Sequence, residues 1–211
     1  MDRVFGPITQ VFRGYTYPQI KQVVEVLLDS PVTNIEVALN TSNALQLIRK
    51  LSVEFGSEIN VGAGTVLSLE NLKLAHDVGA TFVLSPIQMT KEMLQYCMDN
   101  KILSIPGAFT PTEIAQQFAL GADIVKVFPA NTISYTYANK ICEPLGKVPL
   151  MAVGGVTTKN IAEVILGGYS YVGTAGGIFT KSDIISQNKE GLMRSIQEFT
   201  AAFNKVAHLV A

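Results

Sequence analysis

One lysine of this chain stands in the middle of an apolar segment, where a charged side chain is costly. Residues 122–130 read Ala-Asp-Ile-Val-Lys-Val-Phe-Pro-Ala, and this apolar, β-branched run between Gly121 and Pro129 predicts a buried strand. Burial removes the hydration of the Lys126 ammonium group, so we expect a lowered pKa and a neutral, nucleophilic amine. Such an amine can attack a ketone and form a Schiff base. The alternative is a lysine whose stem packs in the strand while its amine reaches solvent or pairs with a carboxylate.

A glutamate in a second apolar segment could pair with that lysine or move protons for it. Glu36 lies within residues 33–39, which also predict a strand. Because side chains alternate along a strand, Glu36, Ala38 and Asn40 share one face, and the opposite face is wholly apolar. In a closed barrel the mixed face points inward, toward Lys126. A buried ion pair adds little stability over apolar packing, so we favour a proton shuttle over a purely structural pair.

Two glycine-rich segments follow neighbouring predicted strands near the end of the chain. Residues 153–157 read Val-Gly-Gly-Val-Thr and residues 172–177 read Val-Gly-Thr-Ala-Gly-Gly. Backbone amides exposed in such loops bind phosphate, and barrels place a phosphate site on the loops after strands seven and eight. Gly154, Gly155 and Gly173 are therefore candidates for binding an anionic group. The alternative is that these glycines only permit tight turns.

Strand and helix patterns alternate along the whole chain, with roughly 25 residues in each strand–helix unit. Alternation of this kind predicts a parallel sheet, and eight units predict an α/β fold, a (β/α)₈ TIM barrel in which residues 1–211 form a single domain. A doubly wound open sheet is the alternative, although it would require weaker and more polar edge strands. The predicted strands cover residues 8–14, 33–39, 58–64, 81–84, 101–105, 122–128, 149–153 and 170–173.

Helices are expected between the strands, with a glycine-rich loop and a last helix over residues 188–209 at the end. In a barrel, functional residues gather where the strands end. Asn34 and Asp123 stand at strand starts and are set aside, and His76 and His208 are expected on helices outside the barrel. The residues expected at the functional rim are Arg13, Glu36, Asn40, Thr65, Ser85, Pro86, Pro106, Gly107, Lys126, Gly154, Gly155 and Gly173.

Composition argues against several other classes of function. The net charge is −1 without a basic run, so neither nucleic-acid nor membrane binding is expected. No apolar stretch approaches the ~20 residues of a membrane span, and the N-terminus lacks the apolar core of a signal peptide. Cys97 and Cys142 have no metal or redox spacing, which favours a reducing cytoplasm. Ser85 and Ser104 have no histidine partner at the rim, and no cluster predicts a metal or another cofactor.

Several short motifs occur together and in order along the chain. They are Val-Gly-Ala-Gly-Thr-Val-Leu at 61–67, Leu-Ser-Pro at 84–86, Ile-Pro-Gly at 105–107, Thr-Pro-Thr-Glu at 110–113, Val-Lys-Val-Phe-Pro-Ala at 125–130 and Gly-Gly-Val at 154–156. With these motifs the chain resembles the 2-keto-3-deoxy-6-phosphogluconate (KDPG) and 4-hydroxy-2-oxoglutarate (KHG) aldolases over nearly its whole length.

The resemblance implies a trimeric class I aldolase on a (β/α)₈ barrel. It assigns the Schiff base with pyruvate to Lys126, proton transfer to Glu36, and binding of the pyruvyl carboxylate to Thr65. It also assigns the distal phosphate to Gly154 and Gly155. Pro86 and Phe128 lie in the shared motifs and, with Gly173, complete the expected substrate-binding residues.

The chain departs from this family pattern at three places. Asn40 stands where many relatives have an arginine that binds the pyruvyl carboxylate, Val153 replaces a common threonine, and the last loop lacks a common serine. The chain has four arginines, and Arg13 is the one at the end of a predicted strand, next to the strand of Glu36. We therefore expect Arg13 to bind an anionic group of the substrate, the pyruvyl carboxylate rather than the distal phosphate.

The sequence thus predicts a cytoplasmic homotrimeric lyase without a cofactor. Its substrate would be a 2-keto acid, either a phosphorylated KDPG-like sugar acid or KHG, cleaved to pyruvate and an aldehyde. Two alternatives stay open at this point. One is an isomerase, epimerase or decarboxylase on a phosphate-binding barrel, which would need a further acid or base at the rim. The other is a non-catalytic barrel that binds sugar phosphates.

Overall fold

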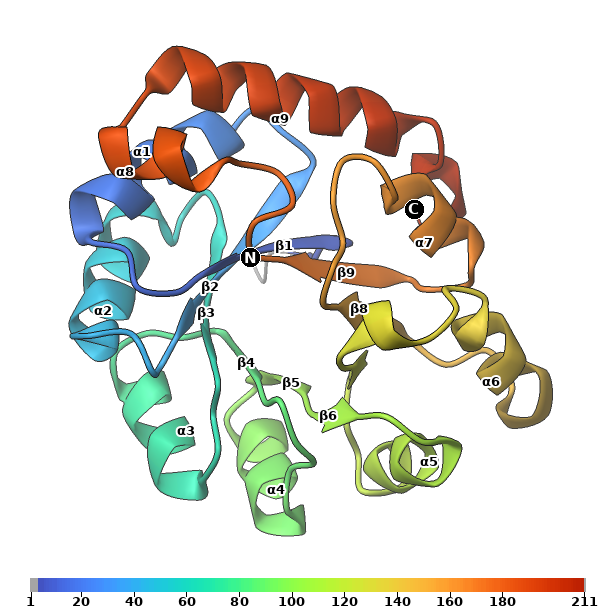
Figure 1. Cartoon of the computed structure of the whole chain (residues 1–211). Helices are drawn as coiled ribbons and strands as arrows, with labels where there is room; N and C mark the ends of the chain where they lie inside the picture. The colour runs from blue at the N-terminus through green and yellow to red at the C-terminus, as the bar shows by residue number, and fades with distance from the viewer. Residues whose placement is uncertain (1–3, 211) are drawn as a thin grey trace.

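The computed structural model describes residues 4–210, and in it a ring of parallel strands is surrounded by helices (Figure 1). The strands are β1 (Ile8–Phe12), β2 (Val32–Ala38), β3 (Asn60–Gly64), β4 (Phe82–Leu84), β5 (Leu103–Ile105), β6 (Gly107–Ala108), β7 (Val125–Val127), β8 (Leu150–Val153) and β9 (Tyr171–Thr174). The α-helices are α1 (Tyr17–Leu27), α2 (Ala44–Phe55), α3 (Leu69–Asp77), α4 (Lys91–Asp99), α5 (Pro111–Ala119), α6 (Tyr137–Leu145), α7 (Ile161–Leu166), α8 (Lys181–Ser186) and α9 (Lys189–Asn204). Short 3₁₀ helices, η1 (Ala130–Thr132) and η2 (Ala207–Leu209), complete the described elements.

The strands form a barrel in the order β5-β4-β3-β2-β1-β9-β8-β7-β6. β5 and β6 are two pieces of one extended segment that is interrupted at Pro106. Along this segment, carbonyl groups accept hydrogen bonds from the amides of Ile124, Lys126 and Phe128 at 3.2, 2.8 and 3.2 Å. The segment therefore joins β4 to β7 and closes the ring. The predicted (β/α)₈ barrel is confirmed, and the open-sheet alternative is wrong.

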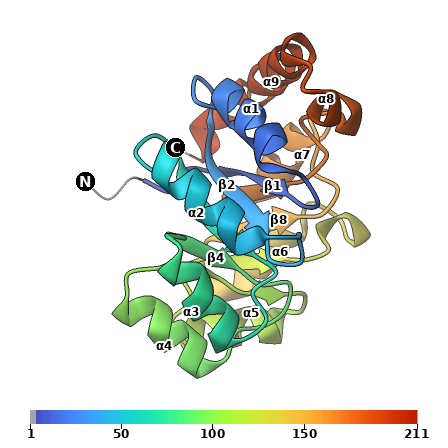
Figure 2. The same cartoon turned by 90° about the vertical axis from the view of Figure 1, so that its left-hand side faces the viewer.

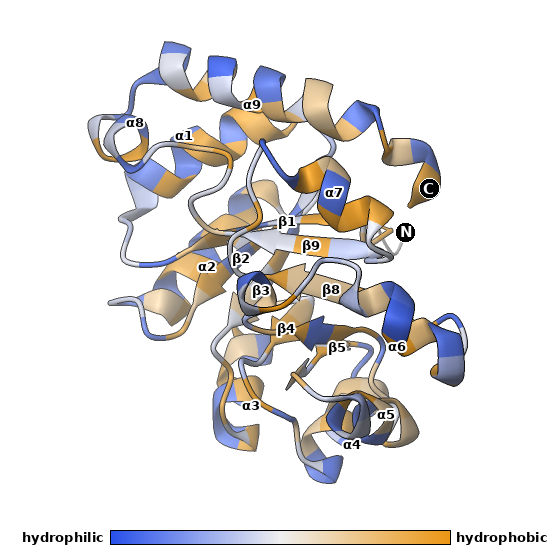
Figure 3. Cartoon of the chain, turned by 45° about the vertical axis from the view of Figure 1, so that its right-hand side comes forward, coloured by the Kyte–Doolittle hydropathy of each residue, from blue (hydrophilic) through white to orange (hydrophobic). Residues whose placement is uncertain are grey.

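The helices pack around the outside of this ring (Figure 2). In α1 the buried residues are Ile20, Val23, Val24 and Leu27, at the helical spacing read from the sequence. Helices such as α7 and α9 accordingly carry both apolar and polar residues along their length (Figure 3). Apolar stripes on helices such as α1 and α2 thus cover the outer face of the sheet.

The end of the chain contains one helix that the sequence pattern did not predict, and the last helix is shorter than expected. α8 occupies part of the segment expected to be a loop. Its start is a short-range signal: the Thr180 hydroxyl accepts a hydrogen bond from the Asp183 amide at 3.2 Å. Helix α8 ends at Ser186, and the next residue, Gln187, has a φ of 55° in the left-handed region. The predicted helix over 188–209 is α9 followed by the separate turn η2.

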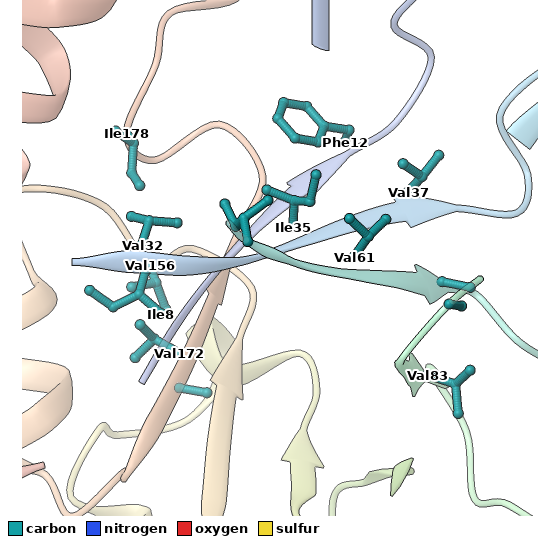
Figure 4. Close-up of a cluster of buried hydrophobic side chains, with 14 of the residues drawn as sticks. Ile8, Phe12, Val32, Ile35, Val37, Val61, Val83, Val156, Val172 and Ile178 are labelled. Carbon is teal, nitrogen blue, oxygen red and sulfur yellow. The ribbon is translucent and has the colours of Figure 1, made fainter. Parts of the chain in front are cut away.

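The core has two layers because strand side chains alternate between the two faces. Outward apolar residues such as Ile8, Phe12, Ile35 and Val61 pack beneath the helices (Figure 4). A second, smaller apolar cluster fills the barrel interior and is built from Phe82, Leu84, Ile105, Ile124 and Met151. The interior cluster leaves the carboxyl ends of the strands to polar residues.

Polar residues at the strand starts stabilise the opposite end of the barrel. The fully buried Asn34 side chain donates to the carbonyl groups of Gly6 and Ile8 at 2.8 and 3.0 Å. The Asp123 carboxylate accepts from both the amide and the hydroxyl of Ser104 at 2.8 Å. These contacts are structural, which agrees with setting Asn34 and Asp123 aside as site residues.

Candidate active site

A cavity of about 430 Å³ lies at the carboxyl ends of the strands. A hollow of about 520 Å³ between α1 and α9 is larger, but none of the predicted site residues lines it. The cavity at the strand ends is lined by Val11, Arg13, Glu36, Thr65, Pro86, Lys126, Phe128, Val153, Gly154, Gly155, Val156, Thr157, Gly173, Thr174, Ala175, Gly176 and Gly177. Segments from both halves of the chain therefore meet in it.

Lys126 projects into this cavity from the middle of β7. Its neighbours Val125 and Val127 point outward into the helix-facing core, and Lys126 itself is 6% exposed. Burial lowers the pKa of its amine, and the charge of Arg13 lowers it further, while Glu36 acts in the opposite direction. The ammonium nitrogen lies 4.8 Å from the centre of the Phe128 ring. The buried lysine of the sequence prediction is thus present, with its amine facing the cavity.

Glu36 lines the same cavity from β2 and is 3% exposed. A Cβ added to Gly64 on the adjacent strand β3 would come within 1.3 Å of its Oε1 atom, so only a glycine there leaves room for the carboxyl group. Burial raises the pKa of Glu36, and the charges of Lys126 and Arg13 oppose this rise. Its Oε2 atom is buried without a hydrogen-bond partner in the described part of the chain. A carboxyl group whose pKa is raised in this way holds a proton more readily than an exposed glutamate and can act in proton transfer.

Among the ion pairs of the described residues, none joins Lys126 to Glu36. The charge of each group nevertheless alters the pKa of the other. Both side chains line the cavity, and the amine is left without a carboxylate partner. This arrangement differs from the structural pair considered as an alternative, because a direct ion pair would occupy the amine.

Arg13 extends from the end of β1 over the cavity and contacts Thr65. Its Nη2 atom lies 3.5 Å from the Thr65 hydroxyl, at the long limit of a hydrogen bond. Thr65 has a φ of 58°, which is unusual for a β-branched residue and is found at sites where local geometry is imposed by function. Together the guanidinium group and the hydroxyl form one polar wall of the cavity, close to Glu36 and Lys126.

Another part of the cavity lining is made of backbone from the loops after β8 and β9. The amides of Gly155, Val156, Ala175 and Gly176 donate to no acceptor within residues 4–210. Asn160 holds the first of these loops, because its side chain accepts from the Thr157 amide at 2.7 Å and donates to the Gly155 carbonyl at 2.8 Å. Unpaired amides in a fixed loop suit an anionic group such as phosphate.

Of the ten residues expected to react with or bind the substrate, nine line the cavity and Asn40 does not. Ser85, Pro106 and Gly107, which were expected at the same rim, also lie outside its lining. β2 ends at Ala38, whose carbonyl accepts from the Thr41 amide at 2.9 Å, so the chain turns before Asn40. The strand alternation that placed Asn40 beside Glu36 therefore stops too early, and Asn40 is exposed on this turn. Its predicted place in the site is not supported by the geometry.

Both histidines lie outside the barrel, as the sequence predicted. His76 is on α3, where its Nδ1 atom is 3.1 Å from the Tyr96 hydroxyl, and His208 is in η2, so both are outside the barrel. Within residues 4–210 no three His, Cys, Asp or Glu side chains form a group that could hold a metal. None of the helices in that range is long and apolar enough to cross a membrane.

The sequence around this cavity matches a known family of enzymes. The sequence model of the KDPG and KHG aldolases matches residues 5–196. The chain belongs to this aldolase family. It is accordingly a carbon–carbon lyase, as predicted from the motifs.

Named relatives resemble this aldolase along most of its length. A probable 2-dehydro-3-deoxy-6-phosphogalactonate aldolase of Rhizobium meliloti is 28% identical over 174 residues, which cover 82% of each chain. The 2-dehydro-3-deoxy-6-phosphogalactonate aldolase of Escherichia coli is 23% identical and covers 93% of this chain and 96% of that one. A KDPG aldolase structure from Legionella pneumophila, in which pyruvate is captured as a covalent carbinolamine, superposes with a TM-score of 0.83 at 24% identity, covering 92% and 94% of the two chains.

Some residues that line the aldolase cavity were not predicted from the sequence. Val11 lies two residues before Arg13, so its side chain points to the same side of the sheet. The period-two spacing of a strand would therefore have identified it. Thr157 and Ala175 lie in the two glycine-rich loops that were recognised, but only glycines were singled out there. Neither threonine nor alanine carries a distinctive chemical signal in a loop.

The pKa shifts at this site predict how Lys126 responds to pH. Only the neutral amine reacts with acetic anhydride, so Lys126 should label at lower pH than its ordinary pKa of 10.5 requires. Glu36→Gln removes a charge that raises the pKa of Lys126 and should shift the labelling midpoint to lower pH. Arg13→Ala removes a charge that lowers it and should shift the midpoint to higher pH. Residue-resolved mass spectrometry provides the midpoints.

The exposed Lys147 serves as the reference within each sample. Midpoints for Lys126 and Lys147 that coincide, or that move together in both variants, would contradict the electrostatic account of the site.

Proposed function

We propose that this aldolase uses Lys126 to form a Schiff base with a 2-keto acid and releases pyruvate and an aldehyde. The observation that supports this most is the position of the Lys126 amine, buried on a strand and facing a cavity that also contains Glu36 and Arg13. The solved Legionella KDPG aldolase, which holds pyruvate as a carbinolamine, is consistent with this chemistry.

The reaction begins when the neutral Lys126 amine attacks the C2 ketone of the substrate. The ketone oxygen takes up a proton and the nitrogen loses one, which gives a carbinolamine, and Glu36 moves these protons directly or through water. Glu36 then donates a proton to the carbinolamine hydroxyl, which leaves as water, and this gives the protonated Schiff base and a Glu36 carboxylate. Its positive nitrogen is an electron sink at the position where C–C cleavage leaves an electron pair.

Cleavage of the C3–C4 bond follows from this arrangement. Glu36 accepts the proton of the C4 hydroxyl, the C3–C4 electron pair moves into an enamine, and the aldehyde leaves. Protonation of the enamine at C3 gives the Schiff base of pyruvate, which water hydrolyses to pyruvate and the free lysine. The raised pKa of Glu36 suits both steps, because the same group must take a proton and return it.

We further propose that the substrate is a 2-keto-3-deoxy sugar acid with a 6-phosphate, rather than KHG, which has no phosphate. The unpaired loop amides of Gly155, Val156, Ala175 and Gly176 support this preference, since they suit a distal anion. The galactonate and gluconate acids named for the relatives differ in configuration at one carbon. A turnover panel of both epimers, each with and without phosphate, and KHG identifies the substrate.

Oligomeric state and location complete this proposal. We propose a homotrimer, because Ile87 and Phe109 leave apolar surface exposed beside the cavity mouth at 54% and 36%, next to Phe128 at 37%. Cytoplasmic location is supported by Cys97 and Cys142, which are both unpaired. Light scattering should give three times the 22.8 kDa chain mass, and Ile87→Glu should lower it. A monomeric wild-type protein would refute the trimer.

The first catalytic prediction concerns the covalent bond. Borohydride reduction in the presence of pyruvate should attach a three-carbon adduct to Lys126, located by peptide mass spectrometry. Lys126→Ala should lose both the adduct and the lyase activity while keeping its circular dichroism spectrum. The exposed Lys147→Ala is the matched control and should retain both. An adduct on another lysine would assign the reaction elsewhere, and no adduct at all would favour the isomerase or binding-protein alternative.

The second catalytic prediction concerns Arg13 as the partner of the pyruvyl carboxylate. Its guanidinium group contacts the hydroxyl of Thr65, the residue that is expected to bind the same carboxylate. Arg13→Ala should raise the pyruvate concentration needed for half-maximal trapping by about tenfold to a hundredfold, since a hydrogen bond to a charged group contributes roughly 1.5–3 kcal/mol. Arg49→Ala, on the outer helix α2, should change nothing.

Two results would decide against this role of Arg13. Unchanged trapping of pyruvate together with a raised KM for phosphorylated substrates would assign Arg13 to the phosphate instead. Unchanged values in both assays would leave Arg13 without a role in binding.

A further inference from the structure

Two polar side chains interrupt the apolar outer face of the barrel where β1 lies beside β9. Gln10 is fully buried and follows the same face as Ile8 and Phe12, whose side chains belong to the helix-facing core. Its register partner across the sheet is Thr174, which is 2% exposed. Buried polar groups cost free energy unless they are hydrogen-bonded, so their partners indicate what these residues do.

Both side chains bond to the loop that follows β9. The Gln10 amide nitrogen donates to the carbonyl groups of Val11 and Ala175, each at 3.0 Å. The Thr174 hydroxyl donates to the Val156 carbonyl at 2.7 Å and accepts from the Gly177 amide at 3.1 Å. Residues 175–177 are thereby tied to β1 on one side and to the loop after β8 on the other.

Residues 175–177 have few other bonds: the Gly177 carbonyl accepts from the Thr158 amide at 3.0 Å and from the Thr158 hydroxyl at 3.3 Å. Ala175 and Gly176 are exposed, and a Cβ added to Gly176 would meet no atom within 4 Å. The same residues supply two of the unpaired amides in the loops that line the cavity, and Gly155 and Val156 supply two more. Thr174 therefore connects the two loops that carry these amides. Gln10 connects the second loop to β1.

We propose that Gln10 and Thr174 form a loop clamp, a pair of positioning residues that sets the affinity of this aldolase for the distal phosphate of its substrate. This inference rests on the proposed function. Neither residue is assigned contact with the reacting carbon atoms, so the clamp acts on binding of the phosphate and not on cleavage.

One property of Gln10 separates this role from ordinary structural support. Its Oε1 atom is buried and has no hydrogen-bond partner among residues 4–210, so the side chain carries an uncompensated polar atom. Replacing it by leucine, which has a similar size, removes that atom together with the bond to Ala175. A residue needed only for packing would lose stability on this change, whereas Gln10→Leu should keep the thermal midpoint at or above that of the wild type.

The test compares substrates with and without phosphate. For the better 2-keto-3-deoxy-6-phospho epimer, Gln10→Leu and Thr174→Val should each raise KM roughly five- to tenfold, the size expected for one neutral hydrogen bond. In Gln10→Leu, kcat and the constants for the unphosphorylated acid should stay at wild-type values. Thr174→Ser keeps the hydroxyl and should restore the wild-type KM.

Gln22→Leu on α1 is the matched control, because Gln22 also has a buried, unpaired Oε1 atom but no bond to the loop. It should leave every constant unchanged. Should Gln10→Leu fail to fold, Gln10→Met removes the same amide with a more adaptable side chain.

The proposal is overturned by a KM that is unchanged in both clamp variants. It is also overturned by a KM that rises equally for the phosphorylated and unphosphorylated acids, or by a loss confined to kcat. Pyruvate trapping at Lys126 distinguishes failure of the loop-clamp proposal from failure of the proposed function. Wild-type protein that traps no pyruvate refutes the aldolase mechanism, whereas trapping that persists in all variants means that the substrate comparison tests the clamp alone.

Discussion

The upper half of this barrel depends on two buried ionisable groups of opposite charge that are not paired directly. A direct bond between Lys126 and Glu36 would stabilise both charges and occupy the amine. Separation leaves each group with the pKa shift that burial causes, downward for the amine and upward for the carboxyl group. Both shifts favour the neutral forms, so one interior supplies a nucleophile and a group that exchanges protons. The charge of Arg13 links the two, because it disfavours the protonated amine and favours the carboxylate.

The two groups must be held in place by rigid neighbours, and the apolar cluster in the barrel interior provides them. Phe82, Ile124 and Met151 fill the interior below the site with apolar side chains. On β3, Gly62 allows the Phe82 ring to approach the sheet, where an added Cβ would lie 2.5 Å from it. Two residues further along the same strand face, Gly64 leaves room for the Glu36 carboxyl group. Strand β3 thus uses two glycines, two residues apart on one face, to make room for the Phe82 ring and for the Glu36 carboxyl group.

Much of this arrangement is readable from the sequence, and the failures have physical causes. Period-two alternation placed Glu36 and Lys126 correctly because both lie inside regular strands, whereas Asn40 lies beyond the point where β2 ends. The end of β5 before Pro106 was predicted, whereas the short strand β6 and the short helix α8 depend on local backbone signals that are weaker than hydrophobic periodicity. Gln10 offered no signal at all, since its partner Ala175 is 165 residues away in the sequence and is contacted through a carbonyl group.

The site divides its tasks between strands and loops. Lys126 and Glu36, the groups proposed to react, lie on β7 and β2, whose backbones are fixed by hydrogen bonds to neighbouring strands on both sides. The amides proposed to bind phosphate lie on loops, which are held by a few side-chain bonds, including those of Asn160, Thr174 and Gln10. Changes in those few bonds can alter which distal group is accepted without moving the strands. Substrate preference and bond cleavage can therefore change separately in this fold, because different backbone elements carry them.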